Sequence, residues 1–270
     1  MIVNAGYRGK VGAAGAVASL TPKSGVTYTA GLVGVSAEEV SVYAAAISNN
    51  AEITNAATVV YIDFGDVHRK VSVADQVTIS LDGTDYAFDV IGFNHDELTN
   101  PTAYGAATQT GKAGFTFQMH GLFTKTYKMN LSGVNTGGWK NSAMRISTMA
   151  TMKGYMPSAW QTAIKPVNKV SGRGGGYTSG TETVSDNCFL LAEIEIFGSV
   201  TYSVSGEGTQ YAYYKAGNST VKKYSSLADN WWERSPRSGN GTNFCNVNAY
   251  GNIYAYIADT SQGVAFGFCV

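Results

Sequence analysis

The clearest pattern in the chain is an unbroken alternation of side-chain types over residues 245–257, near its end. The odd positions carry small or apolar side chains, and the even positions carry only Asn and Tyr. Because successive side chains of a strand point to opposite faces, one face would be apolar and the other would consist of Asn and Tyr. The run is longer than a typical strand and contains a glycine. The pattern therefore predicts a β-hairpin.

The loop of this hairpin is predicted to contain three residues, 249–251. This length pairs Asn248 with Asn252 and Asn246 with Tyr254 and keeps each face uniform, whereas a two-residue loop would mix polar and apolar side chains on one face. Three-residue loops usually need a left-handed residue at their last position, and a glycine stands there. Asn and Tyr are favoured in binding paratopes. The polar face is therefore expected to be a display surface that the rest of the protein supports.

Earlier in the chain, the patterns predict helices and strands in mixed order. Residues 36–39 read Ser-Ala-Glu-Glu, a capping box that should begin a helix ending near Asn49. A second helix is expected over 141–154, where Met side chains recur at helical spacing. The glycine-rich segment 171–183 is expected to be a flexible loop, because it lacks the motif and the frame of a phosphate cradle. Strands are expected at 58–66, 71–79, 86–93 and 114–123, with an Asp-Gly turn between the second and the third.

The most hydrophobic run, 188–197, is expected to be a central strand or a strand that runs into a turn. On such a strand Glu193 and Glu195 would share one face. Two acids that project from nearly one place cannot flank a sugar from both sides, as glycosidase chemistry requires. We therefore interpret them as ligands for buried backbone groups or for an Arg.

The segment before the hairpin is expected to support it. Residues 208–217 and 221–228 should form a loop and a short helix that lead into the Trp pair. Trp231 and Trp232 are expected to be core anchors beneath the hairpin, and Arg234 is expected to pair with a buried acid or with carbonyls.

Composition indicates a folded, β-rich protein. Hydrophobic residues make up 44% of the 270 residues and charged residues 14%, so a core is available, and 32 Gly accompany only 5 Pro. The formal net charge is zero, so bulk electrostatics attract neither nucleic acid nor anionic membranes. No segment is long and apolar enough to span a bilayer, and residues 1–20 lack the Leu-rich middle of a cleaved signal peptide. Neither nucleic-acid binding nor membrane insertion is expected.

No motif predicts a catalytic residue, a metal or a cofactor. Cys188, Cys245 and Cys269 lack metal-ligand spacing and are expected to be small buried hydrophobes, with a Cys245–Cys269 bridge as an alternative. His95 beside Asp96 is expected to make a hydrogen bond that stabilises its loop, in preference to a catalytic or metal role.

Several segments carry a resemblance to a known kind of domain. They are 90–96 (VIGFNHD), 138–145 (GWKNSAMR), 195–198 (EIFG), 231–236 (WWERSP) and 263–270 (GVAFGFCV). Together they resemble a bacterial and phage domain with a C-type-lectin-like core. The part after Trp231 more specifically resembles the variable proteins of diversity-generating retroelements, which include phage receptor-binding proteins.

The resemblance covers roughly residues 60–270. It implies an α+β fold, with a C-type-lectin-like ligand-binding domain over 58–270 that carries a C-terminal variable β-hairpin region. Residues 1–57 lie outside the resemblance and are expected to be an attachment or oligomerisation segment with a short helix.

In that family a reverse transcriptase changes adenines in a copied template, so positions with Asn-type codons vary on a fixed scaffold. The resemblance implies a scaffold of Trp231, Trp232, Arg234, Ser235, Pro236, Phe244, Cys245 and 263–270. It implies that the variable, ligand-binding positions are Arg237, Ser238, Asn240, Thr242, Asn243, Asn246, Asn248, Tyr250, Asn252, Tyr254, Tyr256, Asp259 and Thr260. Each of these types is reachable from an Asn codon through adenine changes. Glu233 and Gln262 are not, and they are either fixed or outside the scheme.

The function that this resemblance implies is binding of a protein or glycan receptor on a cell surface. The chain would act from a virion tail or an extracellular surface, would not be an enzyme, and could be a homo-oligomer such as a trimer.

A carbohydrate-binding lectin of fixed specificity is the alternative function. A calcium-dependent sugar site has little support, because the segment from Trp231 to the end offers only Asp259 and Glu233 as carboxylates. Formylglycine-generating enzymes resemble the same core, but their chemistry needs a reactive cysteine arrangement. Nothing in the sequence near Cys245 or Cys269 would lower a thiol pKa.

Overall fold

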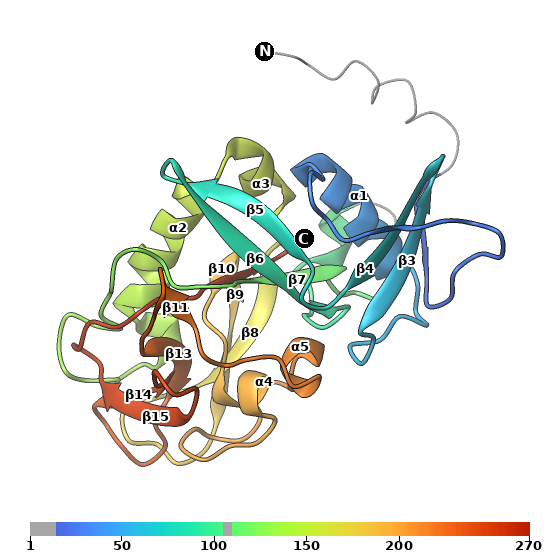
Figure 1. Ribbon diagram of the computed structural model, residues 1–270. Helices are drawn as coiled ribbons and strands as arrows, with labels where there is room; N and C mark the ends of the chain where they lie inside the picture. The colour runs from blue at the N-terminus through green and yellow to red at the C-terminus, as the bar shows by residue number, and fades with distance from the viewer. Residues whose placement is uncertain (1–14, 105–109) are drawn as a thin grey trace.

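An antiparallel sheet of five strands lies in the middle of the molecule (Figure 1). The computed structural model describes residues 15–104 and 110–270, and the structural statements below concern these ranges. The strand order is β10-β16-β7-β6-β5. The strands are β5 (Gln76–Leu81), β6 (Thr84–Phe93), β7 (Phe115–Met119), β10 (Cys188–Phe189) and β16 (Gly267–Cys269). The last strand in the sequence therefore lies between β10 and β7.

Aromatic side chains fill the core around this sheet. The ring centroids of Phe117 and Phe268 lie 5.3 Å apart, and Phe88 meets Phe266 and Phe268 edge to face at 5.4 Å. Trp160, from α3 (Ser158–Ala163), approaches Phe268 to 5.9 Å. Aromatic pairs of this geometry stabilise a core beyond the area that they bury. They fix β16 within the sheet.

The single strand predicted at 71–79 is wrong, because the chain turns in the middle of that range. β4 (Val67–Ser72) ends there, and Ala74 takes a left-handed φ of 72° before β5 begins. The Asp-Gly turn after β5 is confirmed. Asp82 and Gly83 have φ values of 51° and 81°, as a two-residue hairpin turn with the right twist requires.

A smaller sheet and a helix form the N-terminal end of the described chain. The sheet has the order β1-β3-β4-β2, with β1 (Val17–Ser19), β2 (Thr29–Ala30) and β3 (Val59–Phe64). Beside it lies α1 (Ala37–Ser48). The predicted capping box is confirmed, because Glu39 N–H donates to Ser36 Oγ at 3.2 Å and Ser36 N–H donates to the Glu39 carboxylate at 3.0 Å.

This N-terminal part is not a separate structural unit. β1 pairs with β3 along its whole length. The Asn94 side chain, at the end of β6, donates to the carbonyls of Ile47 and Ile53 at 2.9 and 2.8 Å. The sheet β1-β3-β4-β2 therefore includes strands from both sides of the expected boundary between 57 and 58. Residues 1–14, on which most of the signal-peptide interpretation falls, lie outside the described ranges.

Replacing Gly114 with Ala tests how closely α1 packs against the central sheet. A Cβ at Gly114 would overlap the carbonyl oxygen of Ala44 in α1, and backbone cannot move aside as a side chain can. We expect a loss of about 3 kcal/mol in the free energy of unfolding, measured by urea denaturation.

Gly154→Ala is the matched control for that substitution. Gly154 lies inside α2 (Met149–Tyr155), and nothing lies within 4 Å of the position that a Cβ would take there. This variant is expected to gain about 0.5–1 kcal/mol in the free energy of unfolding, because Ala is a better helix former than Gly. Equal effects of the two substitutions would contradict this close contact.

Short helices occupy the stretch of chain between β7 and β8 (Val167–Gly172). The helix predicted over 141–154 is confirmed in part, because a 3-10 turn, η2 (Trp139–Asn141), precedes a π-helical turn, η3 (Met144–Thr148), which continues as α2. Another 3-10 turn, η1, spans Pro101–Tyr104. No helix in the described ranges is long and apolar enough to cross a membrane.

The strand predicted at 188–197 is wrong beyond its first two residues. β10 ends at Phe189, and residues Glu193–Phe197 form the short helix α4. The Glu195 carboxylate accepts from the Ala192 N–H at 3.0 Å and caps the helix, and Gly198, with φ 73°, ends it. A short apolar run buried on all sides has no periodicity that separates a strand from a helix.

The loop and short helix predicted over 208–217 and 221–228 are confirmed in part. A short helix, α5 (Ala212–Lys215), lies in the first range. The second range forms a small hairpin of β11 (Lys223–Tyr224) and β12 (Leu227–Ala228). The glycine-rich segment joins β8 (Val167–Gly172) to β9 (Thr181–Asp186), which pair with each other.

The predicted hairpin belongs to a three-stranded sheet at the far end of the molecule from β1–β4 (Figure 1). The sheet consists of β13 (Trp231–Pro236), β14 (Asn243–Val247) and β15 (Ile253–Ile257), with β14 in the centre. The whole chain is thus an α+β protein, built mostly of sheets with short helices.

Candidate binding surface

The register of the hairpin is the predicted one. Asn246 pairs with Tyr254, and the Asn248 N–H donates to the Asn252 carbonyl at 2.8 Å. Gly251 has φ 82°, the left-handed conformation that the three-residue loop requires. The Asn248 side chain also accepts from the N–H groups of Tyr250 and Asn252 at 2.9 and 3.0 Å. Asn248 therefore holds the loop closed.

Three tyrosines of this hairpin project into solvent. Tyr250 at the tip is 85% exposed, and Tyr254 and Tyr256 on β15 are 47% and 38% exposed. The rings of Tyr254 and Tyr256 lie 5.3 Å apart. Tyr250, Tyr254 and Tyr256 are called the tyrosine surface below. Asn252, between the tip and the strand, is exposed as well.

Asn246 departs from the expectation of an open Asn/Tyr face, because its side chain is fully buried. Its register partner on β13 is Trp232, which is buried on the same face and donates from Nε1 to the Tyr127 carbonyl at 2.8 Å. Phe244 is buried there too. The polar face is therefore covered over β14 and opens to solvent only at β15.

The turn between β13 and β14 holds the next group of expected variable positions. The Asn240 side chain accepts from the N–H groups of Thr242 and Asn243, both at 2.8 Å, so it shapes the turn. The Arg237 guanidinium lies 4.9 Å from the centre of the Tyr202 ring. All of these side chains are half-buried, as are Ser238, Asp259 and Thr260.

Asn135, which the sequence analysis did not single out, joins three loops at this end of the molecule. Its buried side chain donates to the carbonyls of Asn240 and Asn243 at 2.8 and 2.6 Å, and it accepts from the Gly175 N–H at 2.7 Å. At Gly174 a Cβ would overlap the Asn135 carbonyl. The glycine-rich segment, expected to be a flexible loop, is thus tied down, and its glycines permit the close approach.

A neighbouring loop adds apolar groups that the sequence analysis also missed. Leu131 is 88% exposed, and Val134 is exposed as well. Gly133 lies so close to β15 that a Cβ there would meet Ile257 Cδ1 at 2.8 Å. An isolated apolar pair in a polar loop is the signal that could have identified this segment.

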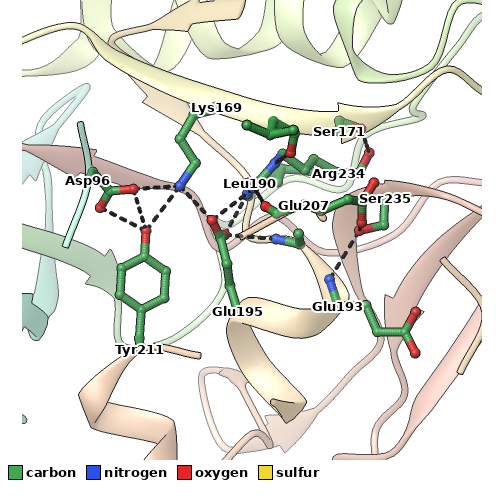
Figure 2. A network of polar contacts seen from close by, with 12 residues as sticks. Asp96, Lys169, Ser171, Leu190, Glu193, Glu195, Glu207, Tyr211, Arg234 and Ser235 are labelled. Atoms are coloured by element: carbon green, nitrogen blue, oxygen red, sulfur yellow. Dashed lines mark hydrogen bonds and ion pairs between the residues drawn. The ribbon is translucent and has the colours of Figure 1, made fainter. Parts of the chain in front are cut away.

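A buried ionic network joins β8, α4 and β13 (Figure 2). We use this name for Asp96, Lys169, Glu195, Glu207, Tyr211 and Arg234. Lys169 Nζ lies 2.7 Å from both Asp96 and Glu195 and donates to the Tyr211 hydroxyl at 3.1 Å. Arg234 donates to the two Glu195 oxygens, and so β8, α4 and β13 meet at one carboxylate.

In this network, pairing with cations changes the pKa of Asp96 and Glu195 more than burial does. Burial alone would raise the pKa of Asp96, but the Lys169 ammonium and His95 hold it well below its ordinary value. For Glu195 the charges of Arg234 and Lys169 likewise lower the pKa against the effect of burial. Both carboxylates are therefore ionised partners of buried cations.

The interpretation of Glu193 and Glu195 as structural ligands is confirmed. Glu195 pairs with Arg234, as expected for that Arg. Glu193 accepts from the backbone N–H groups of residues 201–203. Arg234 also donates to the carbonyls of Val170, Leu190 and Glu207 at 3.0, 3.0 and 2.8 Å.

Two other buried acids are Glu207, a member of the network, and Glu233, the residue before Arg234. Glu207 accepts from the Gly172 N–H at 2.6 Å and from the Ser235 hydroxyl, and burial raises its pKa to about 7. No hydrogen bond within the described ranges reaches the Glu233 carboxyl. Burial raises the pKa of Glu233 well above its usual value, and nearby Glu193 and Glu207 raise it further.

The expected core anchors and cysteines are buried. Trp231 and Trp232 are both fully buried. The three cysteines are free and buried, so the alternative Cys245–Cys269 bridge is absent. Burial raises the pKa of both of these thiols well above the usual value, which disfavours the reactive thiolate.

The His95 side chain packs within the fold. Its ring stacks on Tyr211 with centroids 3.9 Å apart, and Nε2 lies 3.0 Å from the Thr209 carbonyl. Nδ1 lies 3.5 Å from the Asp96 carboxylate. In the described part of the chain, no group of three His, Cys, Asp or Glu side chains could hold a metal ion.

The chain belongs to a family described as a domain of unknown function (DUF6273). The family model matches residues 115–270, more than half of the chain. No curated protein and no solved structure matches it. The matched region begins at β7 and contains the tyrosine surface and all of the ionic network except Asp96, whereas β1 to β6 lie before it.

Proposed function

We propose that this protein binds a receptor, a protein or a glycan, on a cell surface through the tyrosine surface and the loops beside it. The observation that carries the proposal is the exposure of three neighbouring tyrosines on a hairpin that is otherwise embedded in the protein. Tyr supplies a large contact area at low entropic cost, and such side chains are frequent hot spots of interfaces. Asn252 at the tip adds hydrogen-bonding groups.

We further propose that the C-terminal segment from Trp231 on is diversified as in retroelement variable proteins, on a C-type-lectin-like core. The division between buried and accessible positions supports this. The positions expected to be constant are all buried: Trp231, Trp232, Arg234, Ser235, Pro236, Phe244, Cys245 and 263–270. Among the thirteen positions expected to vary, only Asn246 is buried. Glu233 and Gln262, which adenine changes cannot produce from Asn, are buried too.

The arrangement of the two ends supports a role in display on a virion tail or an extracellular surface. The sheet that carries the tyrosines and the sheet β1–β4 lie at opposite ends of the molecule (Figure 1). Attachment through the N-terminal end would leave the tyrosine surface facing outward.

Tyr254→Ser and Tyr256→Ser are each expected to weaken receptor binding by about 1–3 kcal/mol, roughly 5- to 150-fold in Kd. The fluorescently labelled chain would first be screened against a panel of bacterial cells and a glycan array. Titration on the positive surface then compares the variants. Tyr224→Ser is the matched control, because Tyr224 is 49% exposed but lies on β11, outside the tyrosine surface. Unchanged binding by both variants would refute the proposed surface.

Sequences of close relatives test the diversification separately. Substitutions concentrated at the accessible positions, with Trp231, Arg234 and Phe244 constant, are the expected result. A tyrosine surface that stays the same in all relatives would instead favour the lectin of fixed specificity.

A further inference from the structure

The strand β15 reads the same in both directions. Its sequence is Ile-Tyr-Ala-Tyr-Ile, centred on Ala255. A two-fold axis relates identical surface patches, so a strand that pairs with a second copy of itself must offer self-complementary positions. In an antiparallel pair centred on Ala255, Ile253 of one copy faces Ile257 of the other, and Tyr254 faces Tyr256.

The backbone of β15 is free to make such a pair. β15 is an edge strand, with β14 on one side only. Two backbone hydrogen bonds show which residues of β15 bond to β14. Asn248 N–H donates to the Asn252 carbonyl, and Ala258 N–H donates to the Thr242 carbonyl. Even-numbered residues thus bond to β14, and odd-numbered residues turn their N–H and C=O groups outward. Ala255, at the centre of the palindrome, is one of the outward-facing residues.

The outer groups on either side of Ala255 fit the same pairing. Ile253 and Ile257 are also odd-numbered, so their N–H and C=O groups face outward. The Ile257 carbonyl accepts from the Thr260 N–H at 3.0 Å, but a carbonyl oxygen can accept a second bond.

The usual protection of an edge is missing from this strand. Soluble proteins commonly block exposed edges with charged side chains, Pro or a bulge. β15 contains no charged residue and no Pro, and its pairing with β14 is regular over all five residues. Its aromatic and β-branched side chains are the types that favour cross-strand pairing.

We infer that two copies of this protein pair through β15, antiparallel and centred on Ala255, to form a two-fold dimer. The two three-stranded sheets become one continuous sheet. Because directly opposed residues lie on the same face, Tyr254 and Tyr256 of both copies form one row. The pairing itself does not depend on receptor binding. Its consequence does rest on the proposed function, because the row doubles the tyrosine surface and presents two copies to one receptor layer.

The same register also brings together exposed groups outside the strand. Beyond Ile253, the tip of one copy runs along residues 258–260 of the other, beside the loop of Leu131. Tyr250 at the tip and Leu131 in the loop are among the most exposed large apolar side chains, at 85% and 88%. A single strand pair with these few side chains is a small interface, so we expect a dissociation constant in the micromolar range.

Charge pairs at the two Ile positions test both the dimer and its register. The variant with Ile253→Lys and Ile257→Lys places Lys opposite Lys twice, and the variant with Ile253→Glu and Ile257→Glu does the same with Glu. Each is expected to be monomeric, because like charges directly opposite each other destabilise a pair. An equimolar mixture places Lys opposite Glu at both positions and is expected to restore the dimer. Recovery in the mixture also shows that both variants are folded.

Sedimentation equilibrium of the full chain over about 1–500 µM provides the measurement. The unmodified chain should dimerise, each variant alone should weaken the dimer at least about tenfold, and the mixture should recover it. A chain that is monomeric or trimeric throughout, or variants that dimerise as the unmodified chain does, would overturn the inference. None of these outcomes bears on whether single copies bind a receptor, so the receptor titration with the tyrosine variants fails or succeeds independently.

Discussion

Replacing Arg234 with Met is expected to lower the free energy of unfolding by about 3–5 kcal/mol. The side chain is fully buried, and it donates to both oxygens of Glu195 and to three backbone carbonyls. Without it, those carbonyls lose their donor, and Glu195 keeps only Lys169 as a cationic partner. An unpaired buried charge costs far more than the intact pair contributes. Urea denaturation at neutral pH measures the loss.

Arg237→Met is the matched control for this substitution. Arg237 lies only three residues further along, but it is half-buried and contacts the Tyr202 ring. We expect it to cost under about 1 kcal/mol. The loss of stability in Arg234→Lys should lie between these two values, because Lys keeps the positive charge but lacks the planar guanidinium that donates several hydrogen bonds. If Arg234→Met cost no more than Arg237→Met, the network would not be what holds β13 to β8 and α4.

Replacing Glu233 with Gln is expected to stabilise the protein, and increasingly so as the pH rises. The pKa of the buried Glu233 carboxyl is raised well above its usual value, so folding favours the protonated form. A raised pKa contributes stability that is complete below the pKa of the unfolded chain, about 4.5, and is lost as the pH rises toward the folded value. Gln remains neutral throughout. The variant should therefore match the unmodified chain in stability at pH 4 and exceed it by a growing margin as the pH rises to 8.

Glu207 also makes the free energy of unfolding decrease as the pH rises, but over a narrower pH range. Its folded pKa of about 7 implies a loss of about 3 kcal/mol as the pH rises from about 4.5 to 7. Glu233→Gln should leave this part of the curve in place. Glu97→Gln, at a side chain that is 60% exposed, is the control and should leave the slope unchanged. Parallel pH curves for the Glu233 variant and the unmodified chain would show that Glu233 is ionised in the fold.

The features that sequence could predict are those fixed by neighbouring residues. The capping box at Ser36 and Glu39 involves atoms three residues apart, and the register of the hairpin follows from the alternation and from the place of Gly251. Each was confirmed because no distant part of the chain competes with it. The interpretation of Glu195 and Arg234 as structural partners also held, because buried charges need partners wherever they lie.

The features that the sequence did not predict share a different physical origin. Asn246 is buried because Trp232 and the segment at Tyr127, far away in the sequence, cover its face of β14. Whether a polar position faces water depends on what packs on it, and periodicity carries no information about that. Asn135 was missed for the same reason, because its role depends on three loops that meet only in the folded protein. The pairing of β1 with β3, across the expected boundary at residue 57, was missed for the same reason.

The place of β16 in the central sheet has a consequence for synthesis on the ribosome. β7 and β10 are both made before β16, but they are bridged only through β16, which follows β7 by more than a hundred residues. At the usual speed of translation, roughly 7–30 s separate the two strands. All five residues of β7 are buried in the finished protein, so they must wait without their final partner. The nascent chain is therefore expected to depend on chaperones during this interval, because its central sheet closes only after β16 has been made.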